Sequence, residues 1–200
     1  MSEIEEIDLE QQDDVAVNYS EEDIVTLKWN EHIRRRPGMY IGKLGDGSNS
    51  DDGIYVLLKE VLDNAIDEYM MGFGKQVTVD VTETTVTVRD YGRGIPLGKI
   101  VEASSRMNTG GKYDSKAFKK SVGLNGVGIK AVNALSSDFM VQSVRQGEMK
   151  RVQFCRGEIV EETPVVSTDE ADGTLVQFTP DEELFRGYHY RDEFILPLLK

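Results

Sequence analysis

The sequence lacks the features of a secreted, membrane-spanning or DNA-coating protein. Cys155 is the only cysteine, so the chain can form no internal disulfide, and a reducing compartment such as the cytoplasm fits. The chain has no apolar run of about 18 residues and no basic-then-apolar leader, so nothing in it predicts a membrane span or export. Acidic residues outnumber basic ones, 36 to 23, and the net charge of -13 argues against a broad DNA-binding surface within this segment.

The composition indicates an acidic N-terminal tail followed by a globular domain. The 200 residues are 39% hydrophobic and 30% charged, which is enough for one domain with a real core. Residues 3–14 hold seven acids and no base, so we expect a disordered tail over 1–18 and a domain over 19–200. Helical patterns come early and strand patterns late. This order predicts an α+β fold, a two-layer sandwich of a mixed, mostly antiparallel sheet with helices on one face.

The local patterns predict the following elements. Ser20 precedes three acids and is a good N-cap for a helix that ends near Arg34, before Pro37. Residues 39–42 have the pattern of a short extended piece. Further helices are expected over 57–69, 97–105, 129–135 and 191–199, and strands over 77–81, 86–89, 139–145, 150–155, 159–166 and 174–179. The last residues lie in an apolar segment, which looks like a cut through a longer protein.

The stretch 57–69 contains neither proline nor glycine and is rich in helix formers. At about 100° per residue, one arc of roughly 140° collects its apolar residues, namely Leu58, Val61, Leu62, Ala65, Ile66 and Tyr69. A second arc of roughly 100° collects Glu60, Asn64, Asp67 and Glu68. Such a polar face is most often solvated surface. An amide carbonyl also suits Mg²⁺, and a glutamate one turn before it can orient a water against a phosphate, so both interpretations stay open on this helix alone.

Three glycine clusters follow this helix. Asp90 begins the first, Asp-Tyr-Gly-Arg-Gly-Ile-Pro, directly after a predicted strand. The second is Gly-Gly-Lys at 110–112, and the third, at 123–128, opens a helix. Taken singly, each cluster fits an ordinary turn or flexible surface loop at least as well as it fits a ligand-binding site. Neither the P-loop pattern nor the dinucleotide fingerprint fits them.

Taken together and in this order, the motifs are far more specific than any one of them. The chain resembles the ATPase domain of the B subunits of bacterial type IIA topoisomerases, meaning DNA gyrase and topoisomerase IV, within the GHKL superfamily. The resemblance covers roughly residues 19–200 and rests on segments 36–42, 60–68, 90–96, 110–114, 123–128 and 173–174. Segments 37–42 and 110–114 distinguish it from chaperone and mismatch-repair ATPases of the same superfamily. Two alternative functions stay open for the chain: an ATPase of the chaperone or mismatch-repair type, and a nucleotide sensor that binds ATP without turnover.

The resemblance implies a Bergerat-type fold that holds ATP and Mg²⁺ between the sheet and the helices. Glu60 would be the general base, Asn64 would hold Mg²⁺, and Asp90 would accept from the adenine amino group with Thr174 beside it. The other residues implied at the nucleotide are Asp67, Glu68, Arg93, Gly94, Ile95, Pro96, Lys112, Lys119, Gly123, Leu124, Asn125, Gly126, Val127, Gly128 and Arg151. Tyr19 would reach the nucleotide of a partner subunit.

The resemblance also implies how the whole protein would work. The protein would form a homodimer when ATP binds, and this dimerisation would close a gate that drives DNA strand passage. It would act with the A subunit of the topoisomerase and contact DNA through the full-length complex. The following domain would supply a further lysine, so this segment alone should hydrolyse ATP poorly and stay monomeric. Tyr91 stands where Asp or Asn is common and Asn125 where gyrases often carry His, which favours topoisomerase IV over gyrase.

Overall fold

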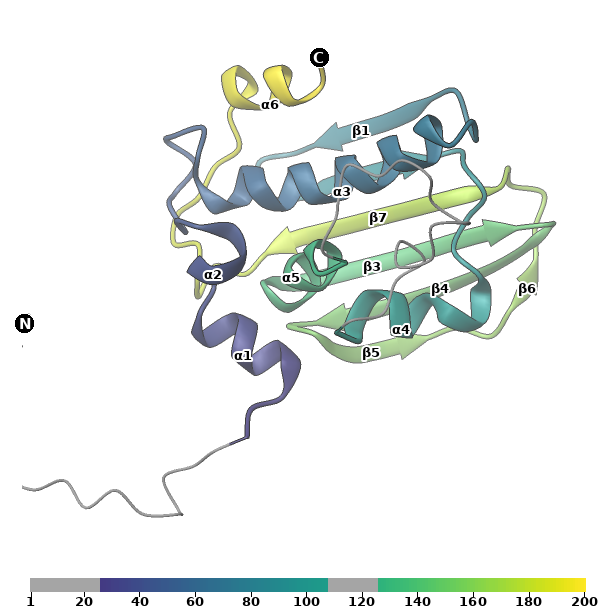
Figure 1. Ribbon diagram of the computed structural model, residues 1–200, viewed down its shortest axis with the longest axis horizontal. Coiled ribbons are helices and arrows are strands. Elements are labelled where there is room, and N and C mark those ends of the chain that lie inside the picture. The colour runs from purple at the N-terminus through teal and green to yellow at the C-terminus, as the bar shows by residue number, and fades with distance from the viewer. Residues whose placement is uncertain (1–25, 108–125) are drawn as a thin grey trace, which may run out of the picture.

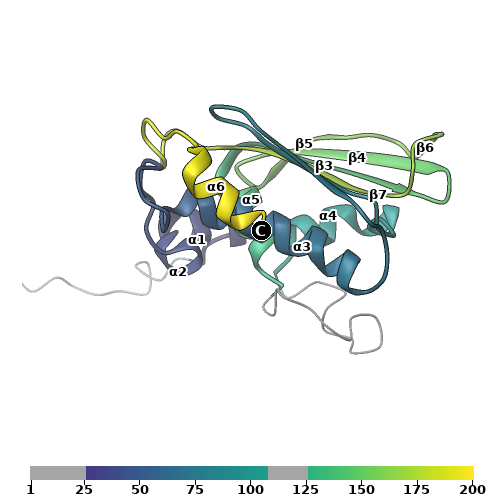
Figure 2. The ribbon, with the colours of Figure 1, turned by 90° about the horizontal axis from the view of Figure 1, so that it is seen from above.

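The computed structural model of the chain describes residues 26–107 and 126–200. They form two layers, a twisted sheet and a set of helices that covers one of its faces (Figures 1 and 2). The predicted two-layer sandwich is confirmed. The tail predicted over residues 1–18 lies outside the described residues.

The sheet follows the order β1-β2-β7-β3-β4-β5, with β6 also paired to β4. The sequence predicts a mixed, mostly antiparallel sheet, and every pair of named strands is antiparallel. The last long strand inserts between two earlier ones, at the centre of the sheet (Figure 1). The strands are β1 (Val77–Val81), β2 (Val86–Asp90), β3 (Ser136–Arg145), β4 (Glu148–Cys155), β5 (Glu158–Glu162), β6 (Val166–Ser167) and β7 (Gly173–Pro180).

The helices are α1 (Trp29–Arg35), α2 (Gly38–Ile41), α3 (Gly53–Met70), α4 (Ile100–Ser105), α5 (Gly128–Ala134) and α6 (Asp192–Leu198), with a 3₁₀ turn at Leu97–Lys99 before α4. None of them is long and apolar enough to cross a membrane, as far as residues 26–107 and 126–200 are concerned.

Three local predictions were wrong. The first helix, predicted to start after Ser20, begins only at Trp29, because the described residues 26–28 before it are not helical and Lys28 has an extended backbone.

Residues 39–42 lie largely in the helical turn α2 instead of an extended piece, because Pro37 caps the turn with φ -59° and Gly42 ends it with φ +68°. The strand predicted over 159–166 is two strands, β5 and β6. Pro164 lies between them and has no N–H to offer to a ladder.

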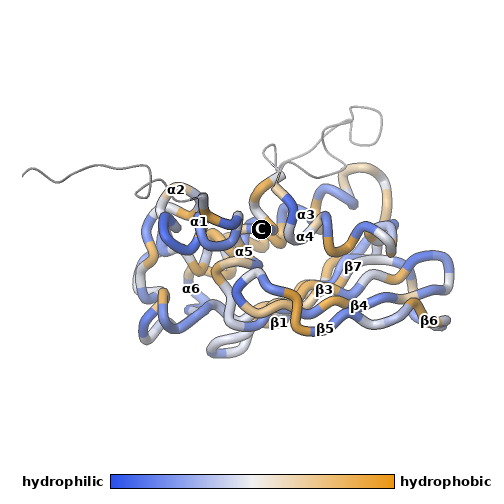
Figure 3. Tube along the Cα trace, turned by 90° about the horizontal axis from the view of Figure 1, so that it is seen from below, coloured by the Kyte–Doolittle hydropathy of each residue, from blue (hydrophilic) through white to orange (hydrophobic). Residues whose placement is uncertain are grey.

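The core lies between the layers, where α3 packs on the sheet and beside α5. Four of the six residues on its predicted apolar arc are buried: Leu58, Val61, Leu62 and Ala65. Ile66 and Tyr69 are 36% and 57% exposed, so the predicted arc was too wide. Because α3 also contacts α5, its buried side is turned toward the polar arc and includes Asp67, which is 1% exposed. In Figure 3, apolar stretches run along the strands around β3.

Candidate active site

Asp90 ends β2 in the middle of the sheet and is nearly buried, with 7% of its surface exposed. Its Oδ1 accepts hydrogen bonds from the backbone N–H groups of Gly92, at 2.9 Å, and Thr174, at 3.2 Å. Its Oδ2 makes no hydrogen bond to any described residue. Burial raises the pKa of this carboxyl above 3.8, and the two backbone hydrogen bonds partly oppose that shift. Asp90 is thus a carboxylate with one oxygen fixed by the protein and the other available to a ligand.

The turn after Asp90 is held by the end of α3. Glu68 accepts hydrogen bonds from the backbone N–H and Nε of Arg93, both at 3.0 Å, and from its Nη2 at 2.9 Å. The Arg93 guanidinium also stacks on Phe73, 4.3 Å from the ring centroid. A Cβ on Gly92 would lie 2.7 Å from the Glu68 Cβ, so only glycine fits there. Glu68 and Arg93 therefore set the shape of the turn together.

The rest of the turn, Gly94 to Pro96, lies across the end of β3. Gly94 has φ +69°, and a Cβ there would overlap the carbonyl oxygen of Val144. Ser143 Oγ donates to the Ile95 carbonyl at 2.7 Å, and Arg145 Nη1 donates to the Gly94 carbonyl at 3.3 Å. Arg145 is not among the residues predicted from the sequence. Its position at the end of a predicted strand, before Gln146-Gly147, was the available signal.

The structure does not bring Arg151 into this group. Arg151 pairs with Gln142 in the β3–β4 ladder, and its Nη2 donates to Gln142 Oε1 at 2.9 Å. The residues on either side of Gln142, namely Val141 and Ser143, face the helices. Because side chains alternate along a strand, Arg151 lies on the opposite face of the sheet. This position gives no support to the prediction that Arg151 contacts the nucleotide.

The second half of the site lies where α3 meets α5. A Cβ on Gly128, the first residue of α5, would overlap the carboxylate of Glu60. One turn along α3, Asn64 Nδ2 donates to the Glu60 carbonyl at 2.9 Å, which orients the amide. Lys130, 2% exposed, donates to the Gly126 carbonyl at 2.6 Å. Lys130 is not among the residues predicted from the sequence, because no pattern in the sequence predicts a lysine so deeply buried.

The remaining predicted residues divide into two groups. Asp67 is buried on α3, and Thr174 and Gly126 to Gly128 lie in described segments beside the groups above. Outside the described residues lie Tyr19, Lys112, Lys119, Gly123, Leu124 and Asn125. Within 26–107 and 126–200, no group of three or more His, Cys, Asp or Glu side chains could hold a metal ion.

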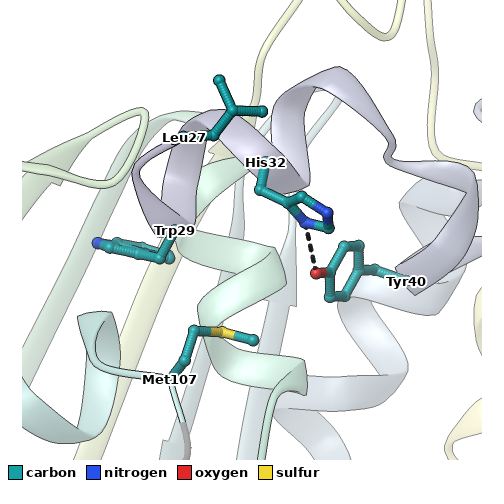
Figure 4. A pocket seen from close by; sticks show the side chains of 5 residues that line it. All are labelled: Leu27, Trp29, His32, Tyr40 and Met107. Atoms are coloured by element: carbon teal, nitrogen blue, oxygen red, sulfur yellow. Dashed lines mark hydrogen bonds between the residues drawn. The ribbon is translucent and has the colours of Figure 1, made fainter. Parts of the chain in front are cut away.

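A hollow of about 440 Å³ lies elsewhere, between the start of α1, α2 and the end of α4 (Figure 4). Leu27, Trp29, His32, Tyr40 and Met107 line it, and His32 Nδ1 and the Tyr40 hydroxyl form a 2.9 Å hydrogen bond. Among residues 26–107 and 126–200, none of the predicted site residues lines this hollow. Most of the described residues predicted for the nucleotide lie instead on α3, in the turn after β2 and at the start of α5.

The family model described as "Histidine kinase-, DNA gyrase B-, and HSP90-like ATPase" matches residues 49–184. This range contains α3, the turn after β2, and the start of α5.

Curated relatives are similar over most of this chain. The B subunit of DNA topoisomerase 4 from Borreliella burgdorferi is 53% identical over 178 residues, which cover 89% of this chain and 30% of the relative. The B subunit of DNA gyrase from Campylobacter jejuni is 37% identical over 187 residues, which cover 89% and 24%. The chain thus spans less than a third of these relatives' length.

A solved structure has a similar fold. It is the crystal structure of the 43K ATPase domain of Thermus thermophilus gyrase B in complex with an aminocoumarin. The TM-score is 0.70 at 33% identity, and the match covers 86% of this chain and 44% of that one.

Proposed function

This chain belongs to the histidine kinase-, DNA gyrase B- and HSP90-like ATPase family, and from that premise we propose that it binds and hydrolyses ATP as part of a type II DNA topoisomerase B subunit. The observation that carries the proposal is that one helix, α3, adjoins two groups of predicted residues, the turn after Asp90 at Glu68 and the start of α5 at Glu60. Asp90 offers a buried acceptor at one end, and Glu60 lies against Gly128 at the other. These are the groups that adenine recognition and phosphate hydrolysis each require.

Asp90 is proposed to recognise adenine. Its Oδ2 accepts a hydrogen bond from the adenine amino group while Oδ1 stays bound to Gly92 and Thr174. Guanine presents a carbonyl oxygen at the same position, which an ionised carboxylate repels. Gly94 to Pro96, fixed across β3, form the wall of the adenine pocket.

Glu60 is proposed to act as general base. It would accept the proton of the water that attacks the terminal phosphate. Its place against Gly128 supports this role, because the N–H groups of Gly126 to Gly128 would contact the phosphate oxygens. By resemblance, Lys112 and Lys119 add positive charge at the phosphates. Hydrolysis of this kind depends on positioning and charge compensation more than on covalent chemistry.

Asn64 is proposed as the protein ligand of Mg²⁺. Its Nδ2 is engaged with the Glu60 carbonyl, and its Oδ1 is a hard oxygen of the kind that Mg²⁺ prefers. A single protein ligand suits the absence of an acidic cluster among the described residues, since Mg²⁺ is commonly held by one or two protein groups and the phosphates. When bound, Mg²⁺ neutralises charge on the phosphate oxygens.

For the whole protein we propose the activity of a topoisomerase IV in preference to a gyrase. The 53% identity to the B subunit of a topoisomerase 4 supports this, although gyrase relatives are also similar. The protein would dimerise on binding ATP, with Tyr19 reaching the nucleotide of a partner subunit, and would act on DNA with an A subunit. The cytoplasm is where such an enzyme meets ATP and DNA.

The test is Glu60→Gln in the full-length protein. We expect ATP binding to persist and turnover to fall about 10²-fold, the usual scale for a general base. Phosphate release measures turnover, and calorimetry with a non-hydrolysable ATP analogue measures binding. Glu102→Gln, which changes a partly exposed glutamate on α4 that pairs with Lys99, is the matched control and should leave both values unchanged. Near-normal turnover in the Glu60 variant would refute the assignment, and a parent that binds ATP without turnover would be a nucleotide sensor.

A further inference from the structure

Arg89 lies one residue before Asp90 in β2, on the sheet face away from the helices. It pairs with Leu175 of β7, and only 8% of its surface is exposed. Its Nη2 donates to the carbonyl of Ala171 at 2.6 Å, and its guanidinium lies 5.2 Å from the centroid of the Tyr91 ring. Its Nη1 is buried without a hydrogen-bond partner in the described part of the chain. A buried donor left unpaired is unfavourable, so the position of Arg89 lowers the stability of the fold.

Ala171 belongs to the segment 168–172, which we call the acidic strap because it carries Asp169, Glu170 and Asp172. Three further contacts hold the strap. The backbone N–H of Thr168 donates to the Gly147 carbonyl at 2.9 Å. Gln142 Nε2 donates to Glu170 Oε2 at 3.1 Å, and the backbone N–H of Gln146 donates to Asp172 Oδ1 at 2.8 Å. The Arg89 contact is the one made directly to the strap backbone from β2, the strand that also carries Asp90.

The strap runs directly into Gly173 and Thr174, which touch Asp90. Gly173 has φ +142°, and a Cβ there would overlap the carbonyl oxygen of Asp90 and lie 2.9 Å from the Cα of Tyr91. The next residue, Thr174, donates its N–H to Asp90 Oδ1. The strap therefore leads directly into one of the two hydrogen bonds that orient the Asp90 carboxylate, at the point where β7 begins its pairing with β3.

We propose that Arg89 is a positioning residue for adenine recognition. From the far face of the sheet it holds the Ala171 carbonyl, which keeps Gly173 and Thr174 against Asp90 and so fixes the direction of Oδ2. Loss of this contact lets the start of β7 move away from the end of β2, and the carboxylate then rotates away from the adenine amino group. The inference rests on the proposed role of Asp90 in binding adenine.

The alternative is that Arg89 merely stabilises the fold, and a double-mutant cycle separates the two roles. The variants are Arg89→Met, Asp90→Ala and the double variant. A non-hydrolysable ATP analogue and its GTP counterpart are the probes, with dissociation constants from calorimetry. We expect Arg89→Met to weaken the ATP analogue about tenfold, the scale of one hydrogen bond to a charged group, and to shrink the preference for ATP over GTP by the same factor. In the Asp90→Ala background, the same change should alter affinity by less than about twofold, because there is no carboxylate left to orient.

The matched control is Arg34→Met. Arg34 likewise donates to a backbone carbonyl, that of Ala134 at 3.1 Å, but it lies on α1 beside Asp181. The Arg34→Met variant should have a lower urea midpoint of unfolding than the parent and the same nucleotide affinity. If Arg89→Met does not fold, Arg89→Lys carries the same cycle, with a smaller loss because lysine keeps one donor.

The outcomes are distinct. An unchanged affinity in Arg89→Met, an equal loss for both nucleotides, or a full additional loss in the Asp90→Ala background would overturn the role of Arg89. If the parent does not bind the ATP analogue, or Asp90→Ala binds it as the parent does, the proposed function itself fails.

Discussion

At the scale of single residues, ligand binding and burial favour opposite protonation states of the Asp90 carboxyl. Ligand recognition needs the charged form, whereas burial favours the neutral one and raises the pKa of the carboxyl above 3.8. The folded protein thus binds this proton more tightly than the unfolded chain. The stability that the group contributes is fully present below the unfolded pKa and is lost as the pH rises through the folded pKa. Near neutral pH the ionised carboxylate serves binding at a cost in stability.

We therefore expect Asp90→Asn to affect stability and ATP affinity differently. The amide keeps an Oδ1 acceptor for Gly92 and Thr174 but loses the charged acceptor for adenine. Urea unfolding at neutral pH should show a ligand-free variant at least as stable as the parent. Calorimetry should show an ATP affinity weaker by about 1–3 kcal/mol.

The pH dependence supplies the control for this variant. As pH falls through the raised pKa, the parent should lose ATP affinity, because the protonated carboxyl is a poorer acceptor. The variant should lose less over the same range. Equal pH profiles for parent and variant would show that Asp90 does not face the nucleotide.

At the scale of elements, the contact between α3 and α5 positions the proposed base. Gly128 begins α5 against the Glu60 carboxylate, with no room for a methyl group. Two helices that are separate in the sequence thus meet with the base at their junction. Gly128 does not have a positive φ, so what requires glycine here is the space taken by the Glu60 carboxylate and not the backbone conformation.

Gly128→Ala should accordingly reduce turnover about 10²-fold, since a displacement near 1 Å at a reacting group can have that effect. Thermal unfolding should change little, because alanine is a better helix former than glycine. Gly98→Ala is the matched control, since a Cβ there meets no atom within 4 Å. Turnover in Gly128→Ala equal to that of the Gly98→Ala control would show that the close contact does not position the base.

At the scale of the whole molecule, one buried carboxylate joins elements from both ends of the described chain. Asp181, just after β7, is 2% exposed. It receives Arg34 Nη2 of α1 at 2.7 Å and Arg156 Nε of the β4–β5 turn at 2.8 Å, and its Oδ1 accepts the backbone N–H of Glu183. The first helix, an edge hairpin and the central strand are tied together at this point, away from the site.

Asp181→Ala should lower the free energy of unfolding by about 1–3 kcal/mol, because it removes a buried charged acceptor whose arginine partners keep some access to water. Urea unfolding measures the loss, and ATP affinity should not change. Glu183→Ala is the control, because the Glu183 side chain is 65% exposed and its pairing contributes little. A loss for Asp181→Ala as small as that of the control would mean that the network does not join the elements energetically.

The sequence by itself determined the features that depend on neighbouring residues in the chain. The helix α3, the hairpin β1–β2 and α5 follow from periodicity and from turn residues a few positions apart. The order of the acidic helix and the glycine clusters was enough to predict the family. These properties are local, because helix and turn formation involve backbone groups within a few residues of one another.

Only the tertiary structure decided which of these local features meet. Strand register placed Arg145 at the Gly94 carbonyl and Arg151 on the opposite face. The insertion of β7 between β2 and β3 brought Thr174 to Asp90, and the packing of α5 on α3 left Ile66 exposed. Such contacts join residues far apart in the chain, so they depend on how whole strands and helices pair. Periodicity within one element carries no information about its partner.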